Sequence, residues 1–335
     1  MGAPAGGSAA EAAAVAGSYS RFAEFEALGR SELYVELARG VAGDPELCAL
    51  LAALQPAKRQ PNLLFGAFRH LCGTPGGYAE FRAGFLDRRT DVVALMLARR
   101  TQTNEPARCA VLLPLLARLP QPLALIEVGA AAGLCLLPDR YAYDYGGCLV
   151  GESELRFACR ANELTPVPGA LPRIVWRAGL DLEPLDLHDA GAVAWLESLV
   201  WPGEGNRLEQ LRAAISIARR DAPRVERGDL RHDLPALAEQ APPGATLVVF
   251  HTAVLAYVAD AADRAAFART VRALGARWVA NEGAEVLTGG VPVPDEPWPH
   301  GRCLLRLDGE PVAWTDPHGT ALDWLDSATA LALSA

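Results

Sequence analysis

The sequence predicts an α/β protein with an all-helical lobe at its N-terminus, followed by a Rossmann-like, mostly parallel sheet that ends in an antiparallel hairpin. Three observations predict this fold class. Over residues 19–118, apolar residues recur at helical spacing without strand-like alternation. From residue 121, short β-rich runs alternate with helical stretches, as in a doubly wound parallel sheet. Near the C-terminus, Asp308 and Gly309 separate two short apolar runs, which indicates a hairpin.

The N-terminal part of the chain divides into a tail and a helical lobe. Residues 1–18 are rich in alanine and glycine and lack the basic start and apolar block of a secretory signal. We expect them to form a flexible tail. The helical lobe is expected over residues 19–120. Asp44 followed by Pro45 marks one helix start, and further helices are predicted over 78–99 and 104–118.

The sheet domain is expected over residues 121–330. The clearest helix between its strands is 206–220, along which one apolar stripe runs. Residues 141–145 and 154–160 are two further β-rich runs, expected to pair as a small hairpin inserted at about 140–170. Five runs are predicted as the strands of the sheet: 123–128, 173–180, 223–229, 246–251 and 276–282.

The composition limits the classes of partner. The chain has 335 residues, 51% of them hydrophobic and 21% charged, as in globular proteins with a core. A formal net charge of −9 argues against a nucleic-acid partner, which normally meets a basic surface. No run of 18 apolar residues exists, so we expect no membrane span. The oligomeric state stays open.

The seven cysteines and six histidines do not indicate a metal site or a disulfide framework. The cysteines contain no C-x-x-C pair, and the histidines contain no H-x-x-x-H pattern. Structural metals and disulfide frameworks need close, repeated spacings. We therefore expect reduced thiols, no bound metal and a cytoplasmic location.

The segment LALIEVGAAAGL, residues 123–134, carries the strongest functional pattern. A predicted strand ends near Glu127, and small residues follow at alternate positions, Gly129, Ala131 and Gly133. Small residues let the backbone approach a bound cofactor closely. The same pattern also suits a tight turn and close helix–strand packing in any α/β domain. Both interpretations stay open at this point.

The order of these elements resembles the fold of class I S-adenosylmethionine-dependent methyltransferases, over roughly residues 121–325. The first motif of that family is E/D-x-G-x-G-x-G, and here Ala131 replaces the middle glycine. The nicotinamide fingerprint G-x-G-x-x-G places its glycines at other offsets. The resemblance implies that Glu127, Gly129, Ala131 and Gly133 contact S-adenosylmethionine.

Two further segments extend this resemblance. GLDLEP, residues 179–184, resembles the acidic end of the family's second strand and implies that Asp181 binds the ribose hydroxyls. Asp144, which lies closer to the turn in sequence, is the alternative. Residues 216–235 resemble the family's helix–strand–acid unit, which implies that Asp229 and Leu230 lie beside the adenine. An aspartate that caps a helix or turn would explain either acid equally well.

Candidate catalytic and substrate residues follow from position. Residues 248–258 resemble the fourth strand and the loop beneath the transferred methyl, which places His251 and Tyr257 there. A histidine can take a proton from an acceptor, although a hydrogen-bonded structural role is the alternative. The polar residues at the predicted helix start before the first strand are candidate substrate contacts, or a solvated first turn. These are Asn104, Glu105 and Arg108.

Nearly the whole chain also resembles an uncharacterised bacterial domain family of unknown function, through residues 60–71, 101–116 and 139–146. That resemblance implies no substrate. The methyltransferase resemblance implies methyl transfer from S-adenosylmethionine to a small-molecule acceptor by in-line displacement, for which positioning is the main requirement. Two alternatives remain: a non-catalytic module that binds the cofactor or acts through contacts, and an NAD(P)-dependent oxidoreductase.

Overall fold

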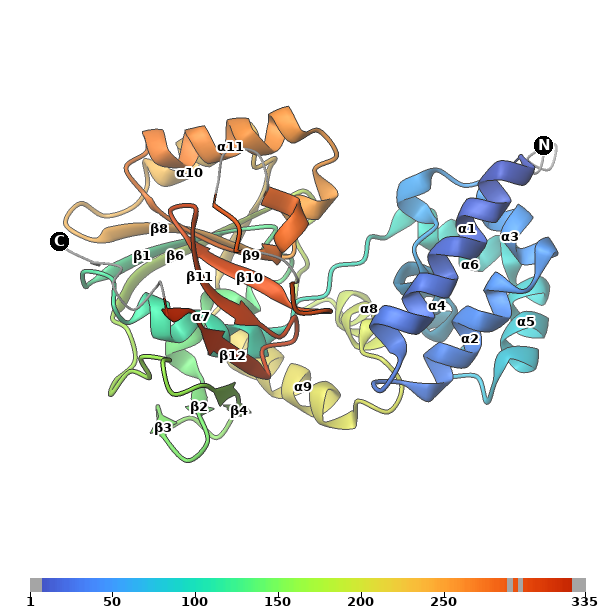
Figure 1. The fold of residues 1–335 in the computed structure, drawn as a ribbon, viewed down its shortest axis with the longest axis horizontal. Coiled ribbons are helices and arrows are strands. Elements are labelled where there is room, and N and C mark those ends of the chain that lie inside the picture. Colours follow the sequence, from blue (N-terminus) through green and yellow to red (C-terminus); the bar gives the residue numbers. More distant parts are fainter. Residues whose placement is uncertain (1–7, 288–291, 295–297, 327–335) are drawn as a thin grey trace. The chain divides into compact units, whose positions relative to one another are not determined.

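The structure is a computed structural model that describes residues 8–287, 292–294 and 298–326 (Figure 1). The chain forms two compact units. One comprises residues 1–103 and 188–209, and the other comprises residues 104–187 and 210–335. The sequence analysis placed 188–209 in the sheet domain, whereas these residues fold with the helical unit.

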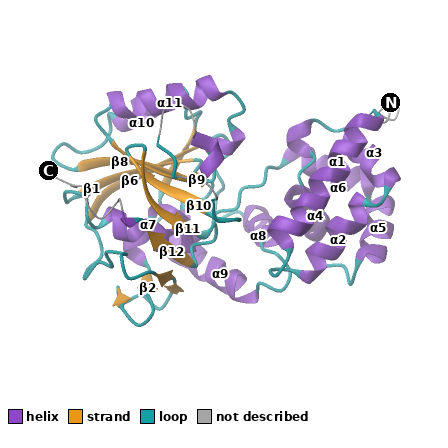
Figure 2. Ribbon diagram, in the orientation of Figure 1, coloured by secondary structure: helices purple, strands orange, loops and turns teal. Residues whose placement is uncertain are grey.

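The helical unit is built around an aromatic core. The ring of Phe65 lies 5.0–6.2 Å from the rings of Tyr19, Phe22, Tyr34 and Phe81. Such pairs contribute about 0.5–1.5 kcal/mol each beyond their buried area. Figure 2 shows helices and loops in this unit. Its α-helices are α1 (Ala9–Arg21), α2 (Glu32–Ala42), α3 (Pro45–Ala52), α4 (Pro61–Cys72), α5 (Tyr78–Asp87), α6 (Arg89–Ala98) and α8 (Ala190–Leu199).

Two tryptophans explain why residues 188–209 belong to this unit. Trp195 and Trp201 are both buried in the aromatic core. The Trp201 ring lies 5.3 Å from the Phe22 ring, and its Nε1 donates to Oδ1 of Asn62 at 2.9 Å. Burial of two large rings is a tertiary effect, and no local sequence pattern identifies the partner.

Three expectations for the N-terminal region were wrong in detail. Residues 9–18 lie in α1 and not in a flexible tail, because Ser8 and Glu11 form a capping box before an alanine-rich run. Residues 1–7 lie outside the described part. The helix expected over 78–99 is divided at Arg88 into α5 and α6. The helix expected over 104–118 is the 3₁₀ turn η3 (Pro106–Arg108) followed by α7 (Cys109–Leu116).

The second unit contains a nine-stranded mixed sheet of order β5-β12-β11-β10-β9-β8-β1-β6-β7. The five predicted strands and the helix α9 (Gly205–Arg220) are confirmed. Strands β7, β6, β1, β8 and β9 run parallel. The strands are β1 (Leu123–Val128), β5 (Arg160–Ala161), β6 (Ile174–Asp181), β7 (Arg224–Arg227), β8 (Thr246–Thr252), β9 (Arg277–Gly283), β10 (Cys303–Leu307), β11 (Glu310–Thr315) and β12 (Ala321–Trp324).

Helices cover the parallel strands on both faces (Figure 1). On one face, α10 (Leu234–Ala238) and α11 (Ala261–Ala273) pack on the sheet. Ile126, Val249 and Trp278 project from the strands into that core. On the opposite face lies α7, all of whose side chains are buried. A parallel sheet needs such cover on both faces.

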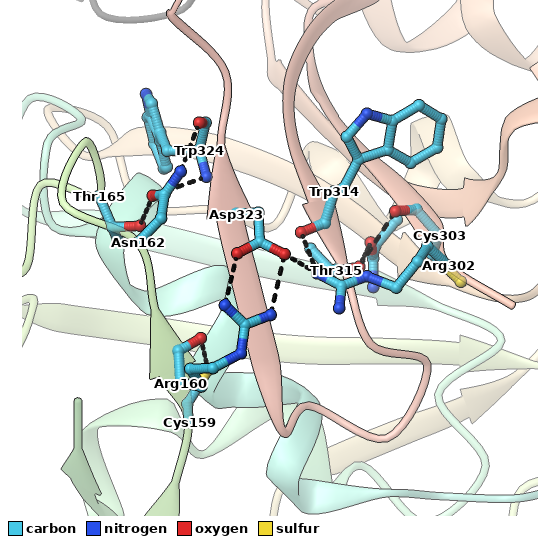
Figure 3. Close-up of polar contacts among 11 residues, drawn as sticks. Cys159, Arg160, Asn162, Thr165, Arg302, Cys303, Trp314, Thr315, Asp323 and Trp324 are labelled. Carbon is cyan, nitrogen blue, oxygen red and sulfur yellow. Dashed lines mark hydrogen bonds and ion pairs between the residues drawn. The ribbon is translucent and has the colours of Figure 1, made fainter. Parts of the chain in front are cut away.

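The hairpin predicted around Asp308 and Gly309 is confirmed as β10 and β11. It is not the end of the sheet, because β12 adds antiparallel to β11 and β5 adds parallel to β12. Figure 3 shows how β5 is fixed there: Arg160 donates to both carboxylate oxygens of Asp323, at 2.8 and 3.0 Å. Arg302 donates to the same carboxylate at 2.6 Å.

The hairpin expected from residues 141–145 and 154–160 was wrong. These runs contain β2 (Ala142–Asp144) and β4 (Arg156–Ala158), which pair in parallel. β2 pairs antiparallel with β3 (Leu149–Val150) instead. Gly146 and Gly147 both have positive φ and reverse the chain directly after β2, so the nearest following residues take the hairpin position.

Candidate functional site

The strand order creates a topological switch point beside β1. After β1 the sheet grows through β6 and β7 on one side, and β8 and β9 then return to the other side. In open α/β sheets, ligands bind beyond the carboxyl ends of the strands at such a point. The turn from Gly129 to Gly133 begins there. We define the candidate site as this turn with Asn104, Glu105, Arg108, Glu127, Asp181 and Thr252.

The turn is not followed directly by an α-helix. Gly129, Ala131 and Gly133 have φ values of 70°, 50° and 74°. Three left-handed residues within five wind the chain tightly and prevent an α-helix from starting. Two 3₁₀ turns follow instead, η4 (Leu134–Leu136) and η5 (Pro138–Arg140).

Asp181 holds this turn in place. Its Oδ2 accepts from the Ala131 amide at 2.8 Å, and its Oδ1 accepts from the Glu183 amide at 2.8 Å. The Leu185 amide donates to the carbonyl of Ala131 at 3.1 Å. Asp144, the alternative acid, accepts from the Gly147 amide in the β2–β3 turn of the inserted sheet. Of the two acids, Asp181 is therefore the one that borders the glycine turn.

Protein side chains occupy the space beside both glycines. A Cβ on Gly129 would lie 2.5 Å from Cγ2 of Val254, and a Cβ on Gly133 would lie 2.8 Å from Cγ of Pro223. Real Cβ contacts are not that short, so both positions need glycine for internal packing alone. The packing interpretation of the turn therefore has direct structural support.

Glu127 is the least satisfied group in the candidate site. Its side chain is 2% exposed, and within the described residues its Oε2 has no hydrogen-bond partner. Burial raises the pKa of Glu127 well above its ordinary value, and Cys135 and Asp181 raise it further while Arg108 opposes them. A carboxyl group in that state can both donate and accept a hydrogen bond.

The segment 104–108 contacts both the residue after the glycine turn and the end of β8. Oδ1 of Asn104 accepts from the Leu134 amide at 2.9 Å, directly after Gly133. Arg108 donates through Nη1 to the carbonyl and hydroxyl oxygens of Thr252, both at 3.1 Å. Asn104 and Glu105 are only 7% and 5% exposed. Asn104 and Glu105 therefore do not form a solvated first turn; Asn104 contacts the residue directly after the glycine turn, and Arg108 contacts the end of β8.

Asp229 and Leu230 lie after β7 and do not join the candidate site by any described contact. The Asp229 carboxylate accepts from Arg231 at 2.6 Å, and Arg231 also reaches Asp263 at 3.1 Å. The hydrogen bond from Arg231 lowers the pKa of Asp229. Leu230 is half-buried against the core beneath α10 and α11.

His251 does not face the candidate site, which corrects the sequence expectation. Glu127 is aligned with Phe250 in the sheet, so the next side chain, His251, projects from the opposite face. The His251 ring is 0% exposed. Its Nε2 accepts from Nε1 of Trp278 at 3.0 Å, and its Nδ1 lies 2.6 Å from Oε1 of Glu282. With both nitrogens engaged, the structural alternative holds for His251.

Two further residues lie at or after the end of β8, the predicted catalytic residue Tyr257 and the buried Thr252. Tyr257 lies in the 3₁₀ turn η6 (Leu255–Tyr257) and is 62% exposed. Thr252, which the sequence analysis missed, is buried and bound by Arg108. The alternation of side chains along a strand could have identified Thr252, because it follows His251 and therefore projects from the same sheet face as Glu127. Among the described residues, no three potential ligand side chains gather as a metal would require.

The comparisons with known proteins give one match. Residues 16–324 match a family described as an uncharacterized protein conserved in bacteria (DUF2332). Neither a curated protein nor a solved structure matches the chain. Of the described helices, none has the length and apolar character needed to cross a bilayer. Since the matched region covers most of the sequence, the chain belongs to this bacterial family.

Proposed function

We propose that the sheet unit binds S-adenosylmethionine beside the Gly129–Gly133 turn and transfers its methyl group to a small-molecule acceptor. The observation that carries the proposal is the buried, incompletely hydrogen-bonded Glu127 at the switch point of a five-stranded parallel array. A ligand with a hydrogen-bond donor would satisfy this carboxyl group.

The acids at the strand ends fit the donors of this cofactor. Glu127, Asp181 and Asp229 lie at or after the ends of β1, β6 and β7, which are neighbours in the sheet. S-adenosylmethionine carries an ammonium, two ribose hydroxyls and an adenine amino group, all of which donate hydrogen bonds. A carboxylate oxygen that already accepts one hydrogen bond retains a second lone pair. Both oxygens of Asp229 already accept two hydrogen bonds each from Arg231, so a donor of the ligand there would have to displace one of these bonds.

The chemistry required of the chain is mainly positioning. When bound, the sulfonium supplies a methyl group: the carbon–sulfur bond breaks with its electron pair kept by sulfur, while a lone pair of the acceptor forms the new bond to carbon. Arg108 carries hydrogen-bond donors and Glu105 carries hydrogen-bond acceptors. These groups would orient the small molecule that receives the methyl group. A general base is needed only if the acceptor arrives protonated.

Calorimetry with three ligands tests the proposal. We expect S-adenosylmethionine and S-adenosylhomocysteine to bind at micromolar concentration and NAD not to bind. Glu127→Gln removes the carboxyl group at equal size, and we expect it to weaken both affinities by about 10- to 100-fold, the scale of a charge-assisted hydrogen bond. The matched control is Asp144→Asn in the inserted sheet, which should leave both affinities unchanged.

A second candidate function is a non-catalytic interaction module. It is favoured by one observation, namely that Val254 and Pro223 already fill the space beside the two glycines. Absence of binding by all three ligands would support this module and contradict the methyltransferase proposal. Binding of NAD alone would favour oxidoreduction instead.

A further inference from the structure

Arg306 is a buried cation whose hydrogen-bond donors are unsatisfied. It lies in β10 and is 0% exposed. Within the described residues, its Nε, Nη1 and Nη2 atoms have no hydrogen-bond acceptor. A buried charge without partners is strongly unfavourable and is rare in folded proteins. The position therefore requires an acceptor that the described chain does not supply.

Arg306 keeps its charge at neutral pH despite this burial. Loss of solvation lowers its pKa to about 10, while the carboxylates of Glu282 and Glu285 act in the opposite direction. A pKa of about 10 is still well above 7, so the guanidinium remains protonated in the cell. The missing acceptor must therefore satisfy a full positive charge.

Glu282 is the complementary unsatisfied group on the neighbouring strand. Its Oε1 lies 2.6 Å from Nδ1 of His251 and accepts from the Val254 and Leu255 amides at 2.8 and 3.1 Å. Its Oε2 has no partner within the described residues. Oε1 of Glu282 thus has three hydrogen-bonding partners, whereas its buried Oε2 has none within the described residues.

The strand register brings these two groups to one face of the sheet. In the antiparallel pair of β9 and β10, Glu282 is aligned with Leu304, and Ala280 is aligned with Arg306. Glu282 and Arg306 are therefore diagonal neighbours on the same face, an arrangement in which Cα atoms are about 7–8 Å apart. No direct ion pair joins them in the described structure. A small molecule with an anionic group at one end and a hydrogen-bond donor at the other would satisfy both Arg306 and Oε2 of Glu282.

We propose that Arg306 and Glu282 form a binding site for a small α-amino acid, with its carboxylate on the guanidinium of Arg306 and its ammonium group on Oε2 of Glu282. A planar guanidinium binds a carboxylate through two parallel hydrogen bonds. Glu282 and Glu285 both act electrostatically on Arg306, so a doubly charged phosphate is disfavoured and a neutral zwitterion is favoured. None of these residues belongs to the candidate site, so this inference does not rest on the proposed function.

Calorimetry on the dialysed full-length protein tests this site. The probes are the proteinogenic amino acids, the corresponding amines that lack the carboxylate, and the corresponding acids that lack the amine. We expect at least one amino acid to bind with one-to-one stoichiometry and to raise the melting temperature. Its amine and acid counterparts should bind at least tenfold more weakly.

Variants locate the binding. Arg306→Met and Glu282→Gln should each weaken the affinity at least tenfold, and Glu282→Gln preserves an acceptor for His251 and the two amides. Arg306→Lys keeps the charge without the planar fork, so it should give a smaller loss and serves if Arg306→Met does not fold. Arg277→Met is the control, because Arg277 lies in β9 but pairs with Asp308 at 2.7 Å.

Two results would overturn the site. If no amino acid binds, Arg306 and Glu282 form a water-bridged ion pair only. If binding occurs but survives in Arg306→Lys, Arg306→Met and Glu282→Gln, it takes place elsewhere. Failure of this test leaves the S-adenosylmethionine titration unaffected, because that titration depends on Glu127.

Discussion

The two faces of the sheet at the carboxyl ends of β1 and β9 each carry a buried acid, and the two acids differ in how the rest of the carboxyl group is held. On one face, Glu127 is buried with an oxygen that has no partner in the described chain. On the other, Oε1 of Glu282 is engaged by His251 and two backbone amides. Glu127 is aligned with Phe250, one residue before His251. A shift of one residue along β8 thus places His251 on the face opposite Glu127, where it engages one oxygen of Glu282.

This contrast changes the role assigned to His251, from proton transfer to hydrogen bonding within the core. From sequence, His251 is a candidate proton acceptor because it lies at the end of the fourth strand of the predicted array. In the structure, Trp278 and Glu282 hold its ring and fix its tautomer, because Nε1 of Trp278 can only donate. The available chemistry at this edge lies with Glu127, Arg108 and Thr252 on the opposite face.

The largest expected effect concerns the turn on the Glu127 face. Gly129→Ala places a Cβ 2.5 Å from Val254 at a φ of +70°. Overpacking costs about 1–3 kcal/mol and left-handed backbone about 1–2 kcal/mol, so we expect the free energy of unfolding to fall by about 2–5 kcal/mol. Chemical denaturation measures this loss.

A matched glycine separates the two contributions. Gly146 has the same φ of +70° but nothing within 4 Å of its added Cβ. Gly146→Ala should therefore lose only the backbone share, about 1–2 kcal/mol. Equal losses in the two variants would mean that Val254 does not make the turn dependent on glycine.

The next effect concerns the opposite face. His251→Leu removes the ring that bridges Trp278 and Glu282 and leaves an indole N–H and a carboxylate oxygen short of one partner each. Unsatisfied buried groups cost about 1–3 kcal/mol each, so we expect a loss of about 3 kcal/mol in the free energy of unfolding. The affinity for S-adenosylmethionine, measured by calorimetry on the folded variant, should remain as in the wild type, whereas a selective loss of this affinity would return His251 to the candidate site.

The last effect, which is small for each step in pH and accumulates gradually, is the pH dependence that Glu127 introduces. Its pKa in the folded state is raised well above the ordinary value of 4.5. The stability associated with its neutral form is therefore fully present below the pKa of the unfolded chain and is lost as the pH rises through the raised folded pKa. The slope is at most about 1.4 kcal/mol per pH unit.

Glu127→Gln tests that sign directly. The variant has no titrating group at this position, so its stability advantage over the wild type should grow as the pH rises above about 4.5, until the folded pKa is passed. Denaturation curves between pH 4 and pH 8 provide the comparison. An advantage that shrinks with increasing pH would indicate that a cationic partner holds Glu127 ionised.

Local sequence patterns predicted the helices and strands better than they predicted which strands pair with one another. The five parallel strands and the hairpin at Asp308 follow from apolar runs and turn residues, which act within a few residues. The parallel pairing of β2 with β4 and the placement of β5 beside β12 join residues far apart in the chain. The ion pair between Arg160 and Asp323 is one such contact, and no spacing in the sequence identifies it.

The candidate site divides in the same way. The turn residues Gly129 and Gly133 were identified from sequence, because positive φ and close packing both select glycine. Asn104 and Arg108 were identified as a polar patch, but their partners Leu134 and Thr252 became known only from the fold.

The sequence by itself determined the type and order of the main elements, namely the helical N-terminal lobe, the five parallel strands and the hairpin at Asp308, because helical and strand periodicities and turn chemistry are local properties. Only the tertiary structure decided that residues 188–209 join the helical unit and that His251 and Glu127 project from opposite faces. The physical reason is that burial and hydrogen-bond satisfaction depend on which distant surfaces meet. A period of two places alternate residues on one face of a strand, but it does not say what covers that face.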